Sequence, residues 1–186
     1  ALTKANGKRY DVDAILHEGR GNARVKARYD ATDESYEAQA RINAINVRDF
    51  MPKDSIGTVS VTAKMRGTGT DIYSPSTEFA ATLSLDRLQY GAWDVRNVNA
   101  TARLRHSVAE LHMTSCNRLL EAAIAGRTRL NKGGITGATL DIQVDNADLR
   151  ALRLTHDTLS VATALTAQAS SNFADRHRWN ADISHV

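Results

Sequence analysis

The segment Ala23-Arg-Val-Lys-Ala-Arg-Tyr29 decides the fold class, because apolar and charged residues alternate in it without a break. In a β-strand successive side chains point to opposite faces, so a segment of this kind has one apolar face and one polar face. The same alternation returns in residues 36–42, 59–65, 79–85, 98–104, 109–113, 120–124, 138–144 and 159–165. We therefore expect about ten to twelve strands, each apolar on one side.

Turn residues separate these segments. Stretches with Gly, Asn and Asp at 18–22, 31–35, 66–69 and 131–134 predict short connections, which join antiparallel neighbours. Only residues 46–51 and 146–152 suggest helical turns; the first ends at Pro52, and Asn146 or Asp148 offers an N-cap for the second. The sequence predicts an all-β fold: an elongated, mostly antiparallel curved sheet folded into a trough, with only short helical turns.

An internal repeat is suggested by residues 45–50 and 147–152, which align at an offset of 102 residues (147 minus 45). The strands that follow align as well, 54–61 with 157–161, once two residues such as Gly57 and Thr58 are omitted. Repetition of one supersecondary unit is typical of elongated, stackable architectures. We expect residues 1–186 to form a single β-rich segment of a larger chain, with the repeat around 45–61 and 147–161.

Composition excludes several functional classes. The net charge of +3 is spread along the chain, whereas nucleic-acid-binding proteins concentrate Lys and Arg on one face, so no nucleic-acid partner is expected. Cys116 is the single cysteine, which rules out an internal disulfide. The sequence has no stretch approaching the roughly 18 apolar residues of a membrane helix.

The ionisable residues do not suggest catalysis. Asp11 and Asp13 share one strand face and are expected to be solvated, and no nucleophile, base and orienting group occur together, so we expect no enzyme activity. His106, His112 and Cys116 share a strand phase, but about 20 Å of strand separates the two histidines, too far for one metal ion. The sequence therefore predicts no cofactor.

A sheet with one apolar face must cover that face. The chain has no helix long enough to do so, and aromatic residues, which usually fill sandwich cores, make up only 5% of it. A smooth aliphatic face suits a wide interior filled by a flexible group such as an acyl chain. The candidate groove residues share one strand phase; they are Val61, Met65, Phe79, Leu83, Leu104, Leu111, Ile124, Leu140, Ile142 and Val161.

The same pattern leaves an alternative open. A structural or adhesive β-sandwich module that binds protein or glycan would also show alternating strands, and its contacts would come from exposed aromatic side chains. Trp93, Trp179 and the five tyrosines are the residues able to serve in that way.

Four stretches carry a family resemblance. They are Ile45-Asn-Val-Arg-Asp-Phe-Met-Pro-Lys-Asp-Ser-Ile-Gly-Thr-Val-Ser-Val61, Arg66-Gly-Thr-Gly-Thr-Asp71, Leu88-Gln-Tyr-Gly-Ala-Trp-Asp-Val-Arg-Asn-Val98 and Asn146-Ala-Asp-Leu-Arg-Ala-Leu-Arg-Leu154. Together they resemble the TamB/AsmA-like proteins of the Gram-negative cell envelope, the Bacteroidetes TamB type especially. The resemblance implies a periplasmic β-taco, a curved sheet with an apolar lumen.

The resemblance also implies a function and partners. Family members span from the inner to the outer membrane and are implicated in phospholipid transport and outer-membrane assembly. The partners it implies are phospholipid acyl chains, neighbouring segments of the same long chain and, through a region outside this segment, an outer-membrane β-barrel assembly protein. The full-length protein would be anchored in the inner membrane.

Overall fold

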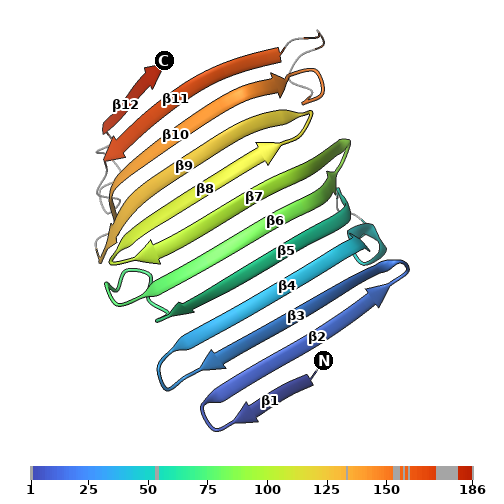
Figure 1. Cartoon of the computed structure of the whole chain (residues 1–186), viewed down its shortest axis with the longest axis vertical. Coiled ribbons are helices and arrows are strands. Elements are labelled where there is room, and N and C mark those ends of the chain that lie inside the picture. The colour runs from blue at the N-terminus through green and yellow to red at the C-terminus, as the bar shows by residue number, and fades with distance from the viewer. Residues whose placement is uncertain are drawn as a thin grey trace.

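The computed structural model describes residues 2–52, 55–132, 134–152, 156, 158, 160–170 and 180–185. They form one sheet of 12 strands in which each strand pairs with its neighbours in sequence (Figure 1). The strands are β1 (Leu2–Asn6), β2 (Arg9–Glu18), β3 (Gly21–Asp30), β4 (Ser35–Asn46), β5 (Ile56–Thr68), β6 (Glu78–Tyr90), β7 (Trp93–Arg105), β8 (Val108–Cys116), β9 (Leu120–Asn131), β10 (Gly134–Asp148), β11 (Ser160–Ser170) and β12 (Asn180–His185).

Every pairing in this sheet is antiparallel, as the short turns predict. The all-β prediction is confirmed. The described residues form a single sheet, and not the two packed sheets of a sandwich.

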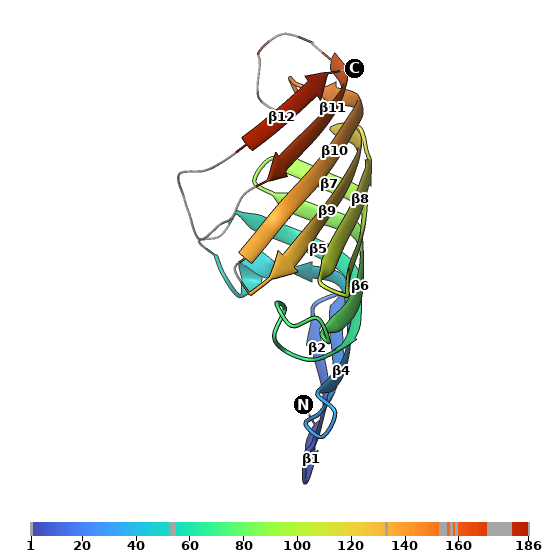
Figure 2. The same ribbon diagram turned by 90° about the vertical axis from the view of Figure 1, so that its left-hand side faces the viewer.

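The sheet is an open, curved layer. Figure 2 shows the first strands nearly in one plane, while β9 to β12 bend progressively to one side, which makes that side concave. The loop between β5 and β6 bends to the same side (Figure 2). Leu104, at the end of β7 beside this loop, is only 1% exposed, the smallest value of any apolar side chain in the core. Because that loop lies on the concave side, the apolar phase of the strands, to which Leu104 belongs, faces the concavity.

The two helical turns expected from sequence differ from each other. Residues 47–49 form a 3-10 helix, η1 (Val47–Asp49), followed by a backbone hydrogen bond from Met51 N–H to the Val47 carbonyl. The second expectation was wrong in part: β10 continues through Asp148, and residues 149–152 form only a turn. The Asp148 carboxylate accepts the Ala151 N–H at 2.9 Å, so Asp148 caps the turn as the sequence suggests.

The hairpins β4–β5 and β10–β11 share one pairing pattern. Ile45 pairs with Val59 and Ala147 with Val161, and each pair follows a shift of register in the first strand, after Ile42 and after Val144. These positions all differ by 102 residues. Val59, and not Val61, is thus equivalent to Val161, so the two strands correspond with no residue omitted. The polar corners of the repeat at 54 and 157 lie outside the described residues.

Candidate functional site: the apolar concave face

Four cross-strand rows of side chains form the concave face of β2 to β10. The row nearest the β5–β6 loop consists of Tyr10, Tyr29, Tyr36, Gly67, Phe79, Leu104, Ala109, Thr128 and Ala138. The row farthest from that loop consists of Leu16, Ala23, Ile42, Val61, Leu85, Val98, Ser115, Ala122 and Val144.

Two inner rows lie between these, and they are richer in small side chains. The first consists of Val12, Ala27, Ala38, Met65, Ala81, Ala102, Leu111, Gly126 and Leu140. The second consists of Ala14, Val25, Ala40, Ala63, Leu83, Ala100, Met113, Ile124 and Ile142. The four rows together make a continuous surface that contains no charged side chain.

The few polar groups in these rows are directed at the backbone. The Ser115 hydroxyl donates to the Leu120 carbonyl at 2.9 Å, and the Thr128 hydroxyl donates to the Gly137 carbonyl at 2.8 Å. Both hydroxyls are therefore satisfied within the sheet, and tyrosine supplies the remaining hydroxyls, all in the row nearest the β5–β6 loop.

Much of this surface is open to solvent. Met65, Leu83, Leu111 and Leu140 are 43%, 40%, 43% and 38% exposed. The accessible surface of the chain is 12961 Å², whereas a compact monomer of 20.3 kDa exposes about 8,800 Å². Soluble monomers rarely expose apolar patches larger than a few hundred Å². This face therefore has the properties of a surface that another group covers.

The structure places the candidate groove residues together. Val61, Met65, Phe79, Leu83, Leu104, Leu111, Ile124, Leu140 and Ile142 all belong to the four rows. Val161 pairs with Ala147 beyond the register shift of β10, next to Val144, which ends the row farthest from the β5–β6 loop. Leu104 differs from the others, because it is covered by protein and does not line the open surface.

Sequence reasoning missed the aromatic part of the face. The rings of Tyr10 and Tyr29 stack with centroids 6.3 Å apart, and the Tyr36 ring lies against Gly67 on the next strand. The alternation of each strand already contains these tyrosines, but only the cross-strand register shows that they form one row. The same row continues through Phe79 and Leu104, which lie beside the β5–β6 loop.

Internal hydrogen bonds hold that loop in place. Thr77, which is 2% exposed, donates its hydroxyl to the Asp71 carbonyl at 2.6 Å and its backbone N–H to the Ser74 carbonyl at 3.1 Å. The Asp71 carboxylate accepts the Tyr73 N–H at 3.0 Å. The loop therefore forms a defined wall at one corner of the concave face.

The convex face is polar and contains the acidic residues considered for catalysis. Asp13 accepts two hydrogen bonds from Arg24, the shorter of 2.7 Å, and Asp11 forms an ion pair of 2.7 Å with Arg28. The hydrogen bond from Arg24 holds the pKa of Asp13 below its ordinary value. A carboxylate kept ionised by an arginine partner is suited to an ion pair and not to proton transfer.

The metal candidates are not brought together. His106 lies in the β7–β8 turn, His112 lies within β8, and Cys116 is exposed at the end of β8. In the part of the chain that the structure describes, no three His, Cys, Asp or Glu side chains are close enough to share a metal ion.

Within the described ranges, no helix has the length and apolar character needed to cross a membrane. Comparison of the chain with models of known families, with curated proteins and with solved structures gives no match. The resemblance to the TamB/AsmA-like family therefore rests on the residues quoted for it.

Proposed function

We propose that the concave face holds phospholipid acyl chains and that the chain acts without catalysis, as a segment of a lipid-conducting envelope protein. One observation carries the proposal: four adjacent rows of the concave face contain no charge and leave large aliphatic side chains open to solvent. A hydrocarbon chain can cover such a surface because it needs no hydrogen bonds. Each methylene that is removed from water stabilises the complex by about 0.8 kcal/mol.

The shape of the surface favours a flexible occupant. Small residues of the inner rows, such as Ala81 and Ala102, stand beside larger ones, such as Met65 and Leu111, along the direction that crosses the strands. A rigid protein surface would have to match these steps closely, whereas an acyl chain adapts to them by rotation about its single bonds.

The cellular setting is part of the same proposal. The residues that resemble the TamB/AsmA-like family support a place in the periplasm, between inner and outer membranes, and a contribution to outer-membrane assembly. In that setting the neighbouring segments of the longer chain would continue the groove at the two edges of the sheet, β1 and β12.

Charge placed in the groove tests the proposal. Leu83→Arg and Ile142→Arg each put a cation into an inner row, where an unpaired charge against hydrocarbon costs several kcal/mol. Thr82→Arg is the matched control, because Thr82 is the neighbour of Leu83 on the same strand and points to the convex face. We expect co-purified phospholipid to fall at least fivefold in the first two variants and to stay unchanged in the third.

Native mass spectrometry of gently purified protein and photo-crosslinking with a tail-labelled phospholipid provide the measurement. Circular dichroism shows whether each variant keeps its sheet. Equal lipid in wild type and Ile142→Arg, or no lipid in wild type, would contradict the proposal and leave the face as a surface for another protein segment.

A further inference from the structure

The convex face contains a row of alternating charges with one interruption. Following the strand pairings from β2 to β9, this row consists of Asp11, Arg28, Glu37, Arg66, Ala80, Arg103, Glu110 and Arg127. The sign of the charge alternates from strand to strand on each side of β6, and the three charges nearest Ala80 follow the same order on both sides: positive, negative, positive. At that position two arginines flank a methyl group, where the alternation would require an anion.

Both neighbouring carboxylates interact with an arginine on the side away from this interruption. Glu110 forms an ion pair of 3.6 Å with Arg127, on the side away from Arg103. Glu37 acts electrostatically on Arg28, whose main partner is Asp11. Within the described residues neither Arg66 nor Arg103 forms an ion pair, so both guanidinium groups are available.

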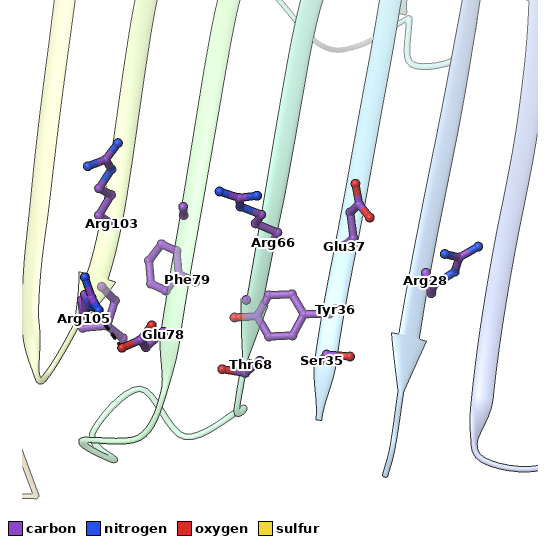
Figure 3. A pocket seen from close by; sticks show the side chains of 13 residues that line it. Arg28, Ser35, Tyr36, Glu37, Arg66, Thr68, Glu78, Phe79, Arg103 and Arg105 are labelled. Carbon is purple, nitrogen blue, oxygen red and sulfur yellow. Dashed lines mark hydrogen bonds and ion pairs between the residues drawn. The ribbon is translucent and has the colours of Figure 1, made fainter. Parts of the chain in front are cut away.

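A hollow of about 550 Å³ is lined mainly by residues of the convex-face phase at this place, together with Tyr36, Gly67, Phe79 and Leu104 of the opposite phase. Its lining includes Arg66, Arg103 and Ala80, with the hydroxyl residues Ser35 and Thr68 toward the ends of their strands. Figure 3 shows the side chains of Arg66 and Arg103 on either side of β6, with Glu37 on the strand beyond Arg66. Four arginines and two glutamates line the hollow, so its local charge is positive.

We propose that Arg66 and Arg103 together bind a phosphate group over Ala80, on the convex face. The two arginines stand on strands separated by β6, so their Cα atoms lie about 10 Å apart, twice the strand spacing. Each side chain is long enough to reach the midpoint, where the small Ala80 side chain leaves room for an anion. The site is separate from the acyl-chain groove, because the sheet lies between them.

Phosphate fits this arrangement better than a single carboxylate. The guanidinium group presents its N–H donors in a planar fork that matches phosphate oxygens, and a dianion can accept such a fork from each side. The two arginine side chains repel each other across the gap, and an anion placed between them adds two attractions at shorter distance, which outweigh this repulsion.

The test is a titration of the full chain with inorganic phosphate at constant ionic strength, followed by NMR at the Nε–H groups of arginine and the amide of Ala80. We expect saturable shifts at Arg66, Arg103 and Ala80. Arg66→Gln and Arg103→Gln should each weaken binding at least fivefold, and Ala80→Glu should abolish it by supplying the missing carboxylate. Arg41→Gln is the control, since Arg41 is also an exposed convex-face arginine and forms no ion pair with any residue that the structure describes.

The outcomes are separable. Binding by Ala80→Glu as tight as wild type, an equal loss in Arg41→Gln, or no saturable shift in wild type would overturn the site. The amide spectra show in the same experiment whether each variant is folded. A parallel titration with glycerol 3-phosphate identifies the source: binding of both compounds supports a site open to phosphate esters such as lipid headgroups, and binding of inorganic phosphate alone supports a site for the free ion.

Discussion

Leu104 and Leu83 have the same side chain, lie on the adjacent strands β7 and β6, and face the same concave side, yet Leu104 is 1% exposed and Leu83 is 40% exposed. Leu104 belongs to what we call the covered corner, formed by Tyr36, Gly67, Thr77, Phe79 and Leu104 beside the β5–β6 loop. Leu83 belongs to the open floor, formed by Met65, Leu83, Leu111 and Leu140. One region resembles a small protein core, and the other resembles half of an interface.

The difference shows that stability and ligand capacity are located in different places on one face. A single-layer sheet is held mainly by its backbone ladders, and side-chain packing adds to it where a second layer exists. In this chain the β5–β6 loop lies over the sheet at the corner that contains Leu104 (Figure 2). Substitutions in the corner should therefore change stability, and substitutions on the floor should change binding.

The largest effect is expected for Leu104→Ala. Removing a buried leucine side chain costs the transfer free energy of its methylenes and leaves a cavity, about 2–4 kcal/mol of unfolding free energy. Leu83→Ala, the matched floor variant, removes a side chain that water already reaches and should cost less than about 1 kcal/mol. Urea unfolding followed by circular dichroism measures both. Equal losses would mean that the open floor is packed as tightly as the corner.

The next effect tests how closely the corner is packed. A Cβ at Gly67 would lie 2.5 Å from the Glu78 carbonyl oxygen and 2.5 Å from the Tyr36 hydroxyl, so Gly67→Ala must displace backbone or ring. We expect a loss of about 1–3 kcal/mol, typical of overpacking.

Gly126→Ala is the control for that substitution, because a Cβ there meets its nearest atom, of Leu140, at 3.7 Å, an ordinary contact. Alanine should be neutral or slightly stabilising at this strand position. If Gly126→Ala destabilises as strongly as Gly67→Ala, the loss does not come from close packing in the covered corner.

A smaller effect is expected for the loop itself. Thr77→Ala removes the hydroxyl that binds the Asp71 carbonyl, and the loss of one buried hydrogen bond costs about 1 kcal/mol. Thr82→Ala, on the exposed convex face, should change stability by less than about 0.5 kcal/mol. Thr77→Ser, which keeps the hydroxyl, should recover most of the loss. A Thr77→Ser variant as unstable as Thr77→Ala would assign the effect to the methyl group instead.

The sequence predicts which side chains lie on the apolar face of the sheet, but not which of them are buried by other parts of the protein. Leu83 and Leu104 stand in equivalent alternating segments, so the alternation assigns both to the apolar phase and to the groove. Leu104 is 1% exposed and lies beside residues 69–77, which have no periodic pattern and whose path depends on hydrogen bonds such as that of Thr77. The gap between Arg66 and Arg103 was likewise invisible, because it depends on the register of β5, β6 and β7, which local alternation does not specify.

The smallest effect on stability is expected for the ion pairs of the convex face, with which the contribution of packing in the covered corner can be compared. Asp94 pairs with Arg87 at 2.8 Å and with Arg96 at 2.7 Å, and hydrogen bonds from these two arginines lower the pKa of its carboxyl. A carboxyl whose folded pKa lies below its unfolded value stabilises the fold above that unfolded value, near 3.9, and loses this contribution as the pH falls through the folded pKa. Its side chain is 37% exposed, so screening by water keeps the contribution to about 0.5 kcal/mol or less.

Comparison of wild type with Asp94→Asn between pH 7 and pH 3 isolates this contribution, because the other carboxyls titrate in both proteins. The variant should be slightly less stable at pH 7, and the difference in unfolding free energy should shrink toward zero as the pH falls below 4. The difference should also shrink in about 0.5 M salt, because the Debye length is about 10 Å at 0.1 M and shorter at this higher ionic strength. Urea midpoints at each pH provide the measurement. A difference at pH 7 as large as that of Leu104→Ala would show that charge on the convex face, and not packing in the covered corner, is the main side-chain contribution to the stability of the sheet.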